Sequence, residues 1–128
     1  MTKIRVFVCG PMTPMEGQHK VLGFLENVRK GMRASAELVK AGFAPFSPFT
    51  DFLYWFVLNE GEEITEEQIK GVSLAFVEAC DCVLVLEGAE KSKGAQAEIA
   101  RASELGKKLF GSIDALKRYY RLGMEEGR

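Results

Sequence analysis

A serine, a glycine and a glutamate stand at a spacing that could do chemistry on a small molecule. Ser92 comes just before a stretch with helical character, Gly94 follows it, and Glu98 lies six residues past the serine. A helix that begins at Ser92 offers unpaired N–H groups and a positive dipole end to an anion, and Gly94 lets a ligand approach the backbone. Glu98 would lie about one and a half turns into this helix. A carboxylate there could attack or stabilise an electron-poor carbon.

Each of these residues also has a purely structural interpretation. Ser92 can act as an ordinary helix N-cap, which stabilises a helix by about 1 kcal/mol. Glu98 can be a solvated glutamate that pairs with Arg101, three residues further along the helix. Spacing alone does not decide between these interpretations and a reactive site.

The elements around this segment place it at one edge of a sheet. The apolar run 83–86 reads as a buried strand that leads into the loop before Ser92, and Glu87 ends it on the side of the expected pocket. A β-branched and aromatic run over residues 3–9 predicts a first strand, and Gly10 and Pro11 give it a sharp exit. In an open parallel sheet, ligands bind beyond the carboxyl ends of the strands, so these loops should meet at one pocket.

The rest of the chain alternates between helices and strands. Residues 12–26 read mainly as a loop that could include a short helix, Asn27 can cap a helix that runs to about residue 41, and Gly42 stops it. Further elements are expected as a short strand at 43–46, an aromatic-rich stretch at 49–58, a helix at 64–80 entered through Thr65, a helix from Ser92 to about residue 105, a strand at 108–110, and a last helix capped by Ser112. This order predicts one domain, residues 1–128, with a parallel α/β sheet of four to five strands flanked by helices.

Composition narrows the class of protein. The net charge of −1, with acidic and basic residues mixed, gives no electrostatic footprint for nucleic acid and no polybasic segment for a membrane surface. The sequence also lacks an apolar run of membrane length and the features of a signal peptide, so we expect a cytoplasmic protein with a small-molecule partner. The three cysteines read as reduced thiols, and with one histidine they lack the spacing of a zinc site. We expect no metal and no cofactor.

The segment Ser92-Lys93-Gly94-Ala95-Gln96-Ala97-Glu98 resembles the Ser-x-Gly-x-x-x-Glu signature of the nucleoside 2-deoxyribosyltransferase-like superfamily, which includes deoxynucleoside 5′-monophosphate N-glycosidases. The resemblance extends over roughly residues 3 to 115. It also includes Phe7-Val8-Cys9-Gly10-Pro11, Asn27-Val28-Arg29, Gly42-Phe43-Ala44-Pro45-Phe46-Ser47-Pro48, Asp81, and Gly106-Lys107-Lys108-Leu109-Phe110.

This resemblance implies a Rossmann/flavodoxin-like sheet, a homodimer or higher homo-oligomer, and cleavage of the bond between a sugar and a nucleobase. It implies that Glu98 is the catalytic nucleophile, and the serine at position 92 favours a nucleoside 5′-monophosphate as substrate. Water as acceptor makes the enzyme a hydrolase, and a second base makes it a transferase. The residues expected to bind the substrate are Phe7, Gly10, Pro11, Met12, Asp51, Glu87, Gly88, Ser92 and Gly94.

Two positions depart from the family pattern. Members usually carry an aspartate eight residues before the one that matches Asp81, and here that position is Ser73, which cannot act as a carboxylic acid. Candidate replacements are Asp51, Glu66, Glu67 and Glu87. Phe7 stands where a tyrosine hydroxyl is common. A non-catalytic nucleotide-binding protein, which kept the cradle and lost the acid, is therefore the alternative function.

Overall fold

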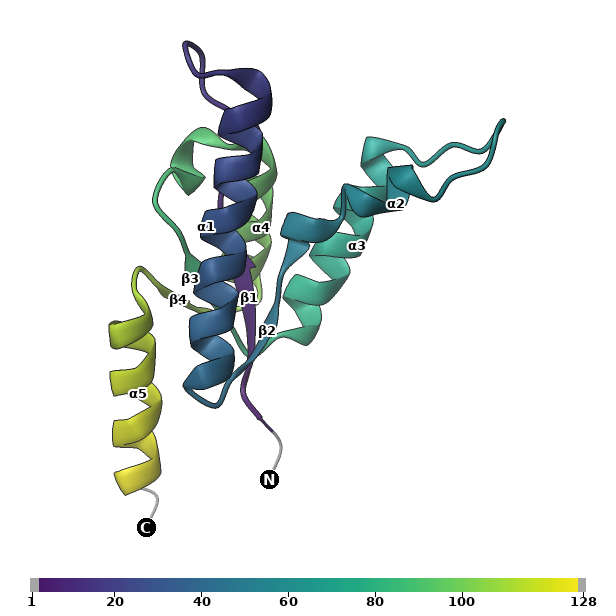
Figure 1. The fold of residues 1–128 in the computed structure, drawn as a ribbon. Helices are drawn as coiled ribbons and strands as arrows, with labels where there is room; N and C mark the ends of the chain where they lie inside the picture. Colours follow the sequence, from purple (N-terminus) through teal and green to yellow (C-terminus); the bar gives the residue numbers. More distant parts are fainter. Residues whose placement is uncertain (1–2, 127–128) are drawn as a thin grey trace.

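The computed structural model describes residues 3–126, which form one parallel sheet covered by helices on both faces (Figure 1). Four strands lie in the order β2-β1-β3-β4, and all neighbours are parallel. Their bounds are β1 Arg5–Cys9, β2 Ala44–Phe46, β3 Cys82–Val85 and β4 Lys108–Phe110. The predicted parallel α/β sheet is therefore confirmed, with four strands, and it is consistent with a Rossmann/flavodoxin-like fold.

Helices alternate with the strands, and they lie on two faces. The longer helices are α1 Lys20–Lys40, α3 Glu66–Ala79, α4 Lys93–Glu104 and α5 Ile113–Glu126; the short elements are η1 Pro48–Thr50, α2 Leu53–Phe56 and η2 Ala89–Lys91. Helices α1 and α5 cover one face of the sheet, and α3 and α4 cover the other. The chain therefore reverses its winding at β1, between its neighbours β2 and β3, and this is the point at which open α/β sheets bind ligands.

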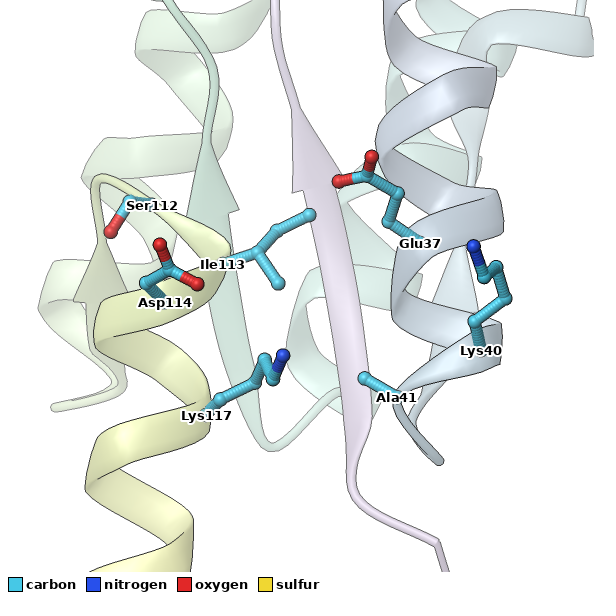
Figure 2. Close-up of a pocket in the computed structure, with 7 residues that line it drawn as sticks. All are labelled: Glu37, Lys40, Ala41, Ser112, Ile113, Asp114 and Lys117. Carbon is cyan, nitrogen blue, oxygen red and sulfur yellow. The ribbon is translucent and has the colours of Figure 1, made fainter.

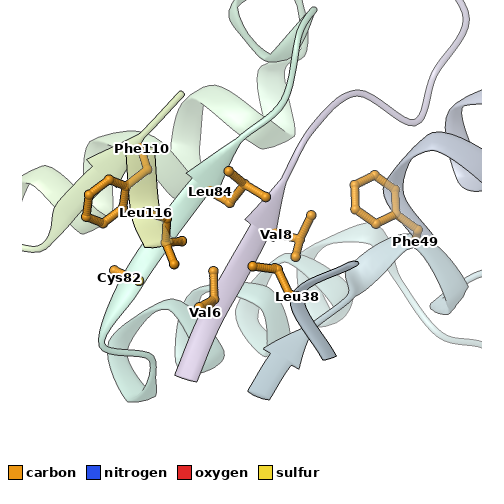
Figure 3. Packing of buried hydrophobic residues seen from close by; sticks show 8 residues of the cluster. All are labelled: Val6, Val8, Leu38, Phe49, Cys82, Leu84, Phe110 and Leu116. Carbon is orange, nitrogen blue, oxygen red and sulfur yellow. The ribbon is translucent and has the colours of Figure 1, made fainter. Parts of the chain in front are cut away.

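The alternation of side chains along β1 divides the core into two layers. Val6 and Val8 face α1 and α5, where they pack with Leu38, Leu84 and Leu116 (Figure 3). Both valines are completely buried. The two helices on this face are thus held to the sheet by one continuous apolar cluster.

Phe7 and Cys9 point to the opposite face, towards α3 and α4. The ring of Phe7 stacks on Phe46 of β2 with 5.5 Å between centroids, and Phe46 stacks on Phe76 of α3 at 4.0 Å. This row of three rings ties β1, β2 and α3 together. It also places the preceding turn of α3, which contains Ser73, near the carboxyl ends of β1 and β2.

Helix α1 begins earlier than the sequence predicted. His19 caps it, and its Nδ1 accepts a hydrogen bond from the Leu22 backbone N–H at 3.1 Å. The expected loop is therefore confirmed for residues 12–19 but wrong for residues 20–26, and the expected cap at Asn27 is wrong. Gly23 is tolerated inside the helix because Pro14 packs directly against it, at a distance that a side chain would not allow. Asn27 lies within the helix, and its Nδ2 donates to the Met12 carbonyl at 3.1 Å.

The other predicted helix ends agree with the structure. Thr65 caps α3 in a reciprocal capping box with Gln68. Gly42 and Gly106 follow α1 and α4 with φ of +96° and +70°, a conformation that glycine adopts without strain. The Ser112 hydroxyl accepts a hydrogen bond from the Ala115 N–H in the first turn of α5.

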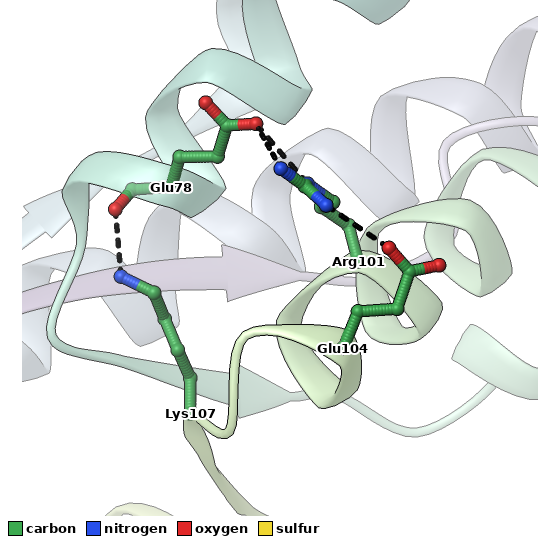
Figure 4. A network of polar contacts seen from close by, with 4 residues as sticks. All are labelled: Glu78, Arg101, Glu104 and Lys107. Carbon is green, nitrogen blue, oxygen red and sulfur yellow. Dashed lines mark hydrogen bonds and ion pairs between the residues drawn. The ribbon is translucent and has the colours of Figure 1, made fainter.

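A group of polar contacts fixes α4 against α3 (Figure 4). The Arg101 guanidinium donates to Glu78 Oε1 of α3 from Nη2 at 2.7 Å and from Nε at 3.1 Å, and to Glu104 at 3.0 Å. Lys107 Nζ donates to the carbonyl oxygens of Glu78 and Cys80, where α3 ends. A cation at this position favours the carbonyl end of the helix dipole. These contacts set the position of α4, the helix that carries Glu98.

Three further observations concern the cysteines, the start of β3 and the apolar character of the helices. Cys9, Cys80 and Cys82 are free and buried, as predicted. Asp81 has a structural role at the start of β3, because its Oδ2 accepts from the Arg5 N–H at 2.8 Å. Within residues 3–126, no helix combines the length and apolar character that crossing a bilayer requires.

Candidate functional site

Glu98 lies at the carboxyl end of β1, on the face covered by α3 and α4. Its side chain is half-buried, and its Oε1 accepts a hydrogen bond from the Cys9 thiol at 3.4 Å. Cys9 is the last residue of β1, so the carboxylate sits at the edge where parallel sheets bind ligands. Arg101 pairs with Glu78 and Glu104 instead of Glu98. The interpretation of Glu98 as a solvated partner of Arg101 is therefore wrong.

The surroundings of Glu98 change its acidity. Burial, with a smaller contribution from the negative charge of Asp51, raises the pKa of Glu98 from 4.5 to about 7, while the Cys9 thiol and the Ser73 hydroxyl oppose the shift. Burial and the Glu98 charge also raise the pKa of the Cys9 thiol far above its usual range. Cys9 therefore keeps its proton, and Glu98 titrates near neutral pH. A carboxyl that titrates near the working pH is typical of functional sites.

Ser73 and Asp51 complete a polar cluster around Glu98. Ser73 is buried in α3 and stabilises the charged form of Glu98 through its hydroxyl. Asp51 follows η1, after β2, and burial raises the pKa of its half-buried carboxyl. Four separate elements thus bring together Cys9, Asp51, Ser73 and Glu98. We call these four residues the Glu98 cluster.

The structure separates the four acids considered as replacements at the Ser73 position. Among the residues that the structure describes, Asp51 is the carboxylate whose charge acts on Glu98. Glu66 and Glu67 are exposed in the first turn of α3, about two turns before Ser73. Glu87 is exposed beyond β3 and lines a cavity whose lining does not include Glu98.

The start of α4 is built as the sequence predicted. Ser92 caps the helix, with its Oγ accepting from the Ala95 N–H at 3.3 Å, which confirms the structural interpretation of this serine. Gly94 is exposed, and a Cβ there would meet only the Ser92 Oγ, at 4.0 Å. The helix start is therefore open to an incoming group. Glu98 leans back towards this end, because helical side chains point to the N-terminus.

A cavity of about 410 Å³ lies on the other face of the same edge, beside α1. Its volume is in the usual range for small-molecule sites. Of the predicted binding residues it includes Pro11, Glu87 and Gly88; the rest of its lining includes Gln18, Asn27, Lys30, Phe49, Leu86 and Lys91.

The loops after β1 and β3 touch between this cavity and the Glu98 cluster. A Cβ on Gly10 would lie 3.1 Å from the Leu86 side chain, and a Cβ on Gly88 would lie 3.1 Å from the ring of Pro11. Gly88 has a φ of +91°, so glycine suits this position for its backbone as well. Of the predicted binding residues, Pro11, Glu87 and Gly88 therefore line the cavity beside α1, whereas Asp51 lies near Glu98 and Ser92 caps the helix that carries Glu98.

Two predicted binding residues have mainly structural surroundings. Phe7 is completely buried in its aromatic stack and presents no surface to a ligand. Met12 packs against the core on the α1 face, and its carbonyl holds Asn27. Sequence reasoning, in turn, missed Cys9 as a neighbour of Glu98. Strand alternation could have found it, because Cys9 ends β1 on the same face as Phe7.

A second cavity, of about 530 Å³, lies between the end of α1 and the start of α5 (Figure 2). Its lining includes Glu37, Lys40, Asp114 and Lys117, so charges of both signs face it. None of the predicted site residues lines it. Within the described residues, no group of three histidine, cysteine or acidic side chains is placed to hold a metal ion.

Comparison with known proteins gives a family. No curated protein matches the chain. Residues 4–110 match the family described as a domain of unknown function, DUF4406. The match runs from the start of β1 to the end of β4, so it includes all four residues of the Glu98 cluster and the start of α4. Because it covers most of its length, the chain belongs to the DUF4406 family.

Proposed function

We propose that the chain cleaves the N-glycosidic bond of a nucleoside 5′-monophosphate, with Glu98 as the nucleophile. The observation that carries this proposal is the position of Glu98, half-buried at the carboxyl end of β1 beside Asp51 and just behind the open start of α4. The resemblance to the nucleoside 2-deoxyribosyltransferase-like superfamily supports the same reaction, since its Ser-x-Gly-x-x-x-Glu signature falls on these elements.

The start of α4 and Glu98 have complementary tasks. A 5′-phosphate at the helix start would receive the N–H groups after Ser92, with Gly94 leaving room for it. Ser92 and Glu98 are separated by about 9 Å along the helix axis, and the glutamate side chain leans back to shorten this span. A phosphate held at the helix start would therefore place the attached sugar near the carboxylate.

Breaking the bond to the base builds positive charge on the anomeric carbon. The ionised Glu98 attacks this carbon and forms an ester, while the base departs with the electron pair of the broken bond and takes a proton from solvent. Water then releases the sugar phosphate and regenerates the carboxylate. If a second base replaces water, the same steps give a transferase.

Ionisation of Glu98 controls the first step. Because burial raises the pKa of Glu98 to about 7, about half of the free protein carries the reactive carboxylate at neutral pH. The value of kcat/KM should therefore rise tenfold per pH unit below about 7 and level off above it.

The direct test is release of free base from a panel of nucleosides and nucleoside 5′-monophosphates, in ribose and deoxyribose forms, measured by liquid chromatography. Glu98→Gln keeps the shape of the side chain and removes the nucleophile, so base release should fall at least 100-fold. Glu63→Gln, an exposed glutamate in the loop before α3, is the matched control and should retain activity. Nucleotide binding by calorimetry without base release would favour the non-catalytic alternative.

The homo-oligomer that the resemblance implies is also part of the proposal. Of the aromatic-rich stretch, Phe49 fills the core, but Phe56 and Val57 are 75% and 74% exposed. Such side chains can supply the apolar centre of an interface. Sedimentation equilibrium should give a mass above that of one chain, and Phe56→Ser should lower the association constant. A monomer at all concentrations would contradict this part of the proposal.

A further inference from the structure

We propose that Asp51 is the general base that activates water to release the sugar from Glu98, an inference that rests on the proposed glycosidase function. The reaction needs such a group in its second half, because water must lose a proton as it attacks the ester. The Glu98 cluster contains one carboxylate besides the nucleophile itself.

The topology brings the two carboxylates to the end of β1 from different sides. Asp51 arrives from β2, which flanks β1 on one edge, and Glu98 arrives from α4, which follows β3 on the other edge. A sugar placed over the end of β1 would then lie between the turn that carries Asp51 and the helix that carries Glu98. In a retaining mechanism, water enters on the face that the base has left, opposite the nucleophile.

The turn that carries Asp51 is firmly anchored. Ser47 Oγ donates to Ser35 Oγ at 2.6 Å, and Ser35 Oγ donates to the Gly31 carbonyl at 2.9 Å. The Phe49 ring lies so close over Gly31 that a Cβ there would be 2.3 Å from it. These contacts hold η1 against α1 and therefore fix the backbone position of Asp51, which follows η1.

The side chain of Asp51 projects away from this anchor. Residues of a 3₁₀ turn are rotated by about 120° each, so Asp51 and Phe49 point in different directions. Its backbone is held from both sides, with Asp51 N donating to the Pro48 carbonyl at 3.1 Å and Asp51 O accepting from Tyr54 N at 3.0 Å. A carboxylate on a fixed backbone is suited to position a water molecule.

Asp51 is the member of the Glu98 cluster, besides Glu98 itself, that can accept the proton of the attacking water. Cys9 is a thiol whose raised pKa keeps it protonated, so it cannot accept a proton from water. Ser73 is a hydroxyl with no basic form at neutral pH. The charge of Asp51 reaches the Glu98 carboxyl and raises its pKa, which shows that the two groups are electrostatically coupled. When Glu98 becomes an uncharged ester, the repulsion between the two carboxylates disappears.

The step balances without a further reactant. In the first half, the bond from Glu98 to the anomeric carbon forms, the bond to the base breaks, and the base takes a proton from solvent. In the second half, the water oxygen bonds to the anomeric carbon, the ester bond to Glu98 breaks, and Asp51 takes the proton of the water. Asp51 then returns this proton to solvent, so the net reaction is hydrolysis.

The test is Asp51→Asn, measured with a nucleotide that the wild-type protein cleaves. The first turnover should persist as a burst of one base per active site, and steady turnover should then fall by about 10²- to 10⁴-fold. Intact-protein mass spectrometry should show the added sugar phosphate, and peptide mapping should place it on Glu98. Azide, which needs no base, should restore turnover and yield the glycosyl azide. Asp114→Asn on α5 is the matched control and should turn over like the wild type.

The outcomes separate this inference from the proposed function. Steady turnover by Asp51→Asn at the wild-type rate, or a slowed first turnover without an adduct, overturns the role of Asp51 and leaves the glycosidase intact. Failure of the wild-type protein to release any base overturns the proposed function and this inference with it. If Asp51→Asn is unstable, Asp51→Ala should show the same adduct and leaves more room for azide.

Discussion

Replacing Glu98 by glutamine should make the protein more stable at high pH, although it removes a charged side chain from a partly exposed edge. Burial, with a smaller contribution from the charge of Asp51, raises the pKa of Glu98 to about 7 in the folded protein, against 4.5 for an ordinary glutamate. Below pH 4.5, both the folded and the unfolded chain carry the proton, and the group contributes nothing. Between pH 4.5 and 7, the unfolded chain has lost the proton that the folded chain still holds, so stability falls as the pH rises.

The size of this effect follows from the same two values. Each pKa unit corresponds to about 1.4 kcal/mol, so the full loss for a pKa raised from 4.5 to about 7 is about 3.5 kcal/mol, of which about 2.5 kcal/mol falls between pH 5 and pH 8. Above about pH 7 the folded chain is ionised too, and the loss stays constant. Glutamine has no proton to lose, so Glu98→Gln should lack this decline.

Urea denaturation of the wild type, Glu98→Gln and the control Glu63→Gln at pH 5 and pH 8 measures the effect. The stability difference between Glu98→Gln and the wild type should move by about 2.5 kcal/mol in favour of glutamine from pH 5 to pH 8. Comparing the two pH values removes any constant effect of glutamine on packing. Glu63→Gln should show no such change. An equal difference at both pH values would refute the reasoning, because Glu98 would then titrate as in the unfolded chain.

Substitutions at three further positions probe the framework that holds the site. Gly31→Ala should lower the free energy of unfolding by about 2 kcal/mol, because its Cβ would lie 2.3 Å from the buried Phe49 ring; urea denaturation measures this, and unchanged stability would contradict the packing. Ser92→Ala should lower the free energy of unfolding by about 1 kcal/mol, because the hydrogen bond from Ala95 N is lost, and Ser92→Asp should restore it. If the wild type and Ser92→Ala are equally stable in thermal denaturation, the capping role of Ser92 is excluded. Lys107→Met should lower the free energy of unfolding by about 1 to 2 kcal/mol, because the carbonyls at the end of α3 lose their donor. The rate of amide hydrogen exchange should increase most in the last turn of α3.

The fold could be predicted where local chemistry decides it. The Thr65 capping box, the left-handed glycines at positions 42 and 106, and the β-branched strands each act through neighbouring residues, so the pattern is visible in the sequence. The start of α1 could not be predicted in this way. Gly23 is unfavourable inside an isolated helix, and only its contact with Pro14 makes it suitable there. His19 is also a less usual cap than asparagine, which pointed to Asn27.

The site was predictable in part for the same reason. Helix spacing correctly placed Glu98 between one and two turns after the cap at Ser92. The general position of ligand sites in parallel sheets correctly predicted that both residues lie at the carboxyl ends of the strands. Finding which candidate acid lies near Glu98 required the three-dimensional structure, because the path of β2 and not sequence spacing brings Asp51 there. The division of the binding residues between the cavity beside α1 and the surroundings of Glu98 likewise depends on contacts between distant loops, such as Pro11 with Gly88.

The contacts of Arg101 with Glu78 have a consequence for how salt acts on this protein. They lie on the surface, one turn beyond Glu98, yet they fix the separation of the two helices that carry Glu98 and Ser73. Dissolved ions screen such exposed pairs, and they do so more strongly as the Debye length falls from about 10 Å at 0.1 M to about 3 Å at 1 M. Ionic strength can therefore loosen the geometry around a half-buried carboxylate without any ion reaching it.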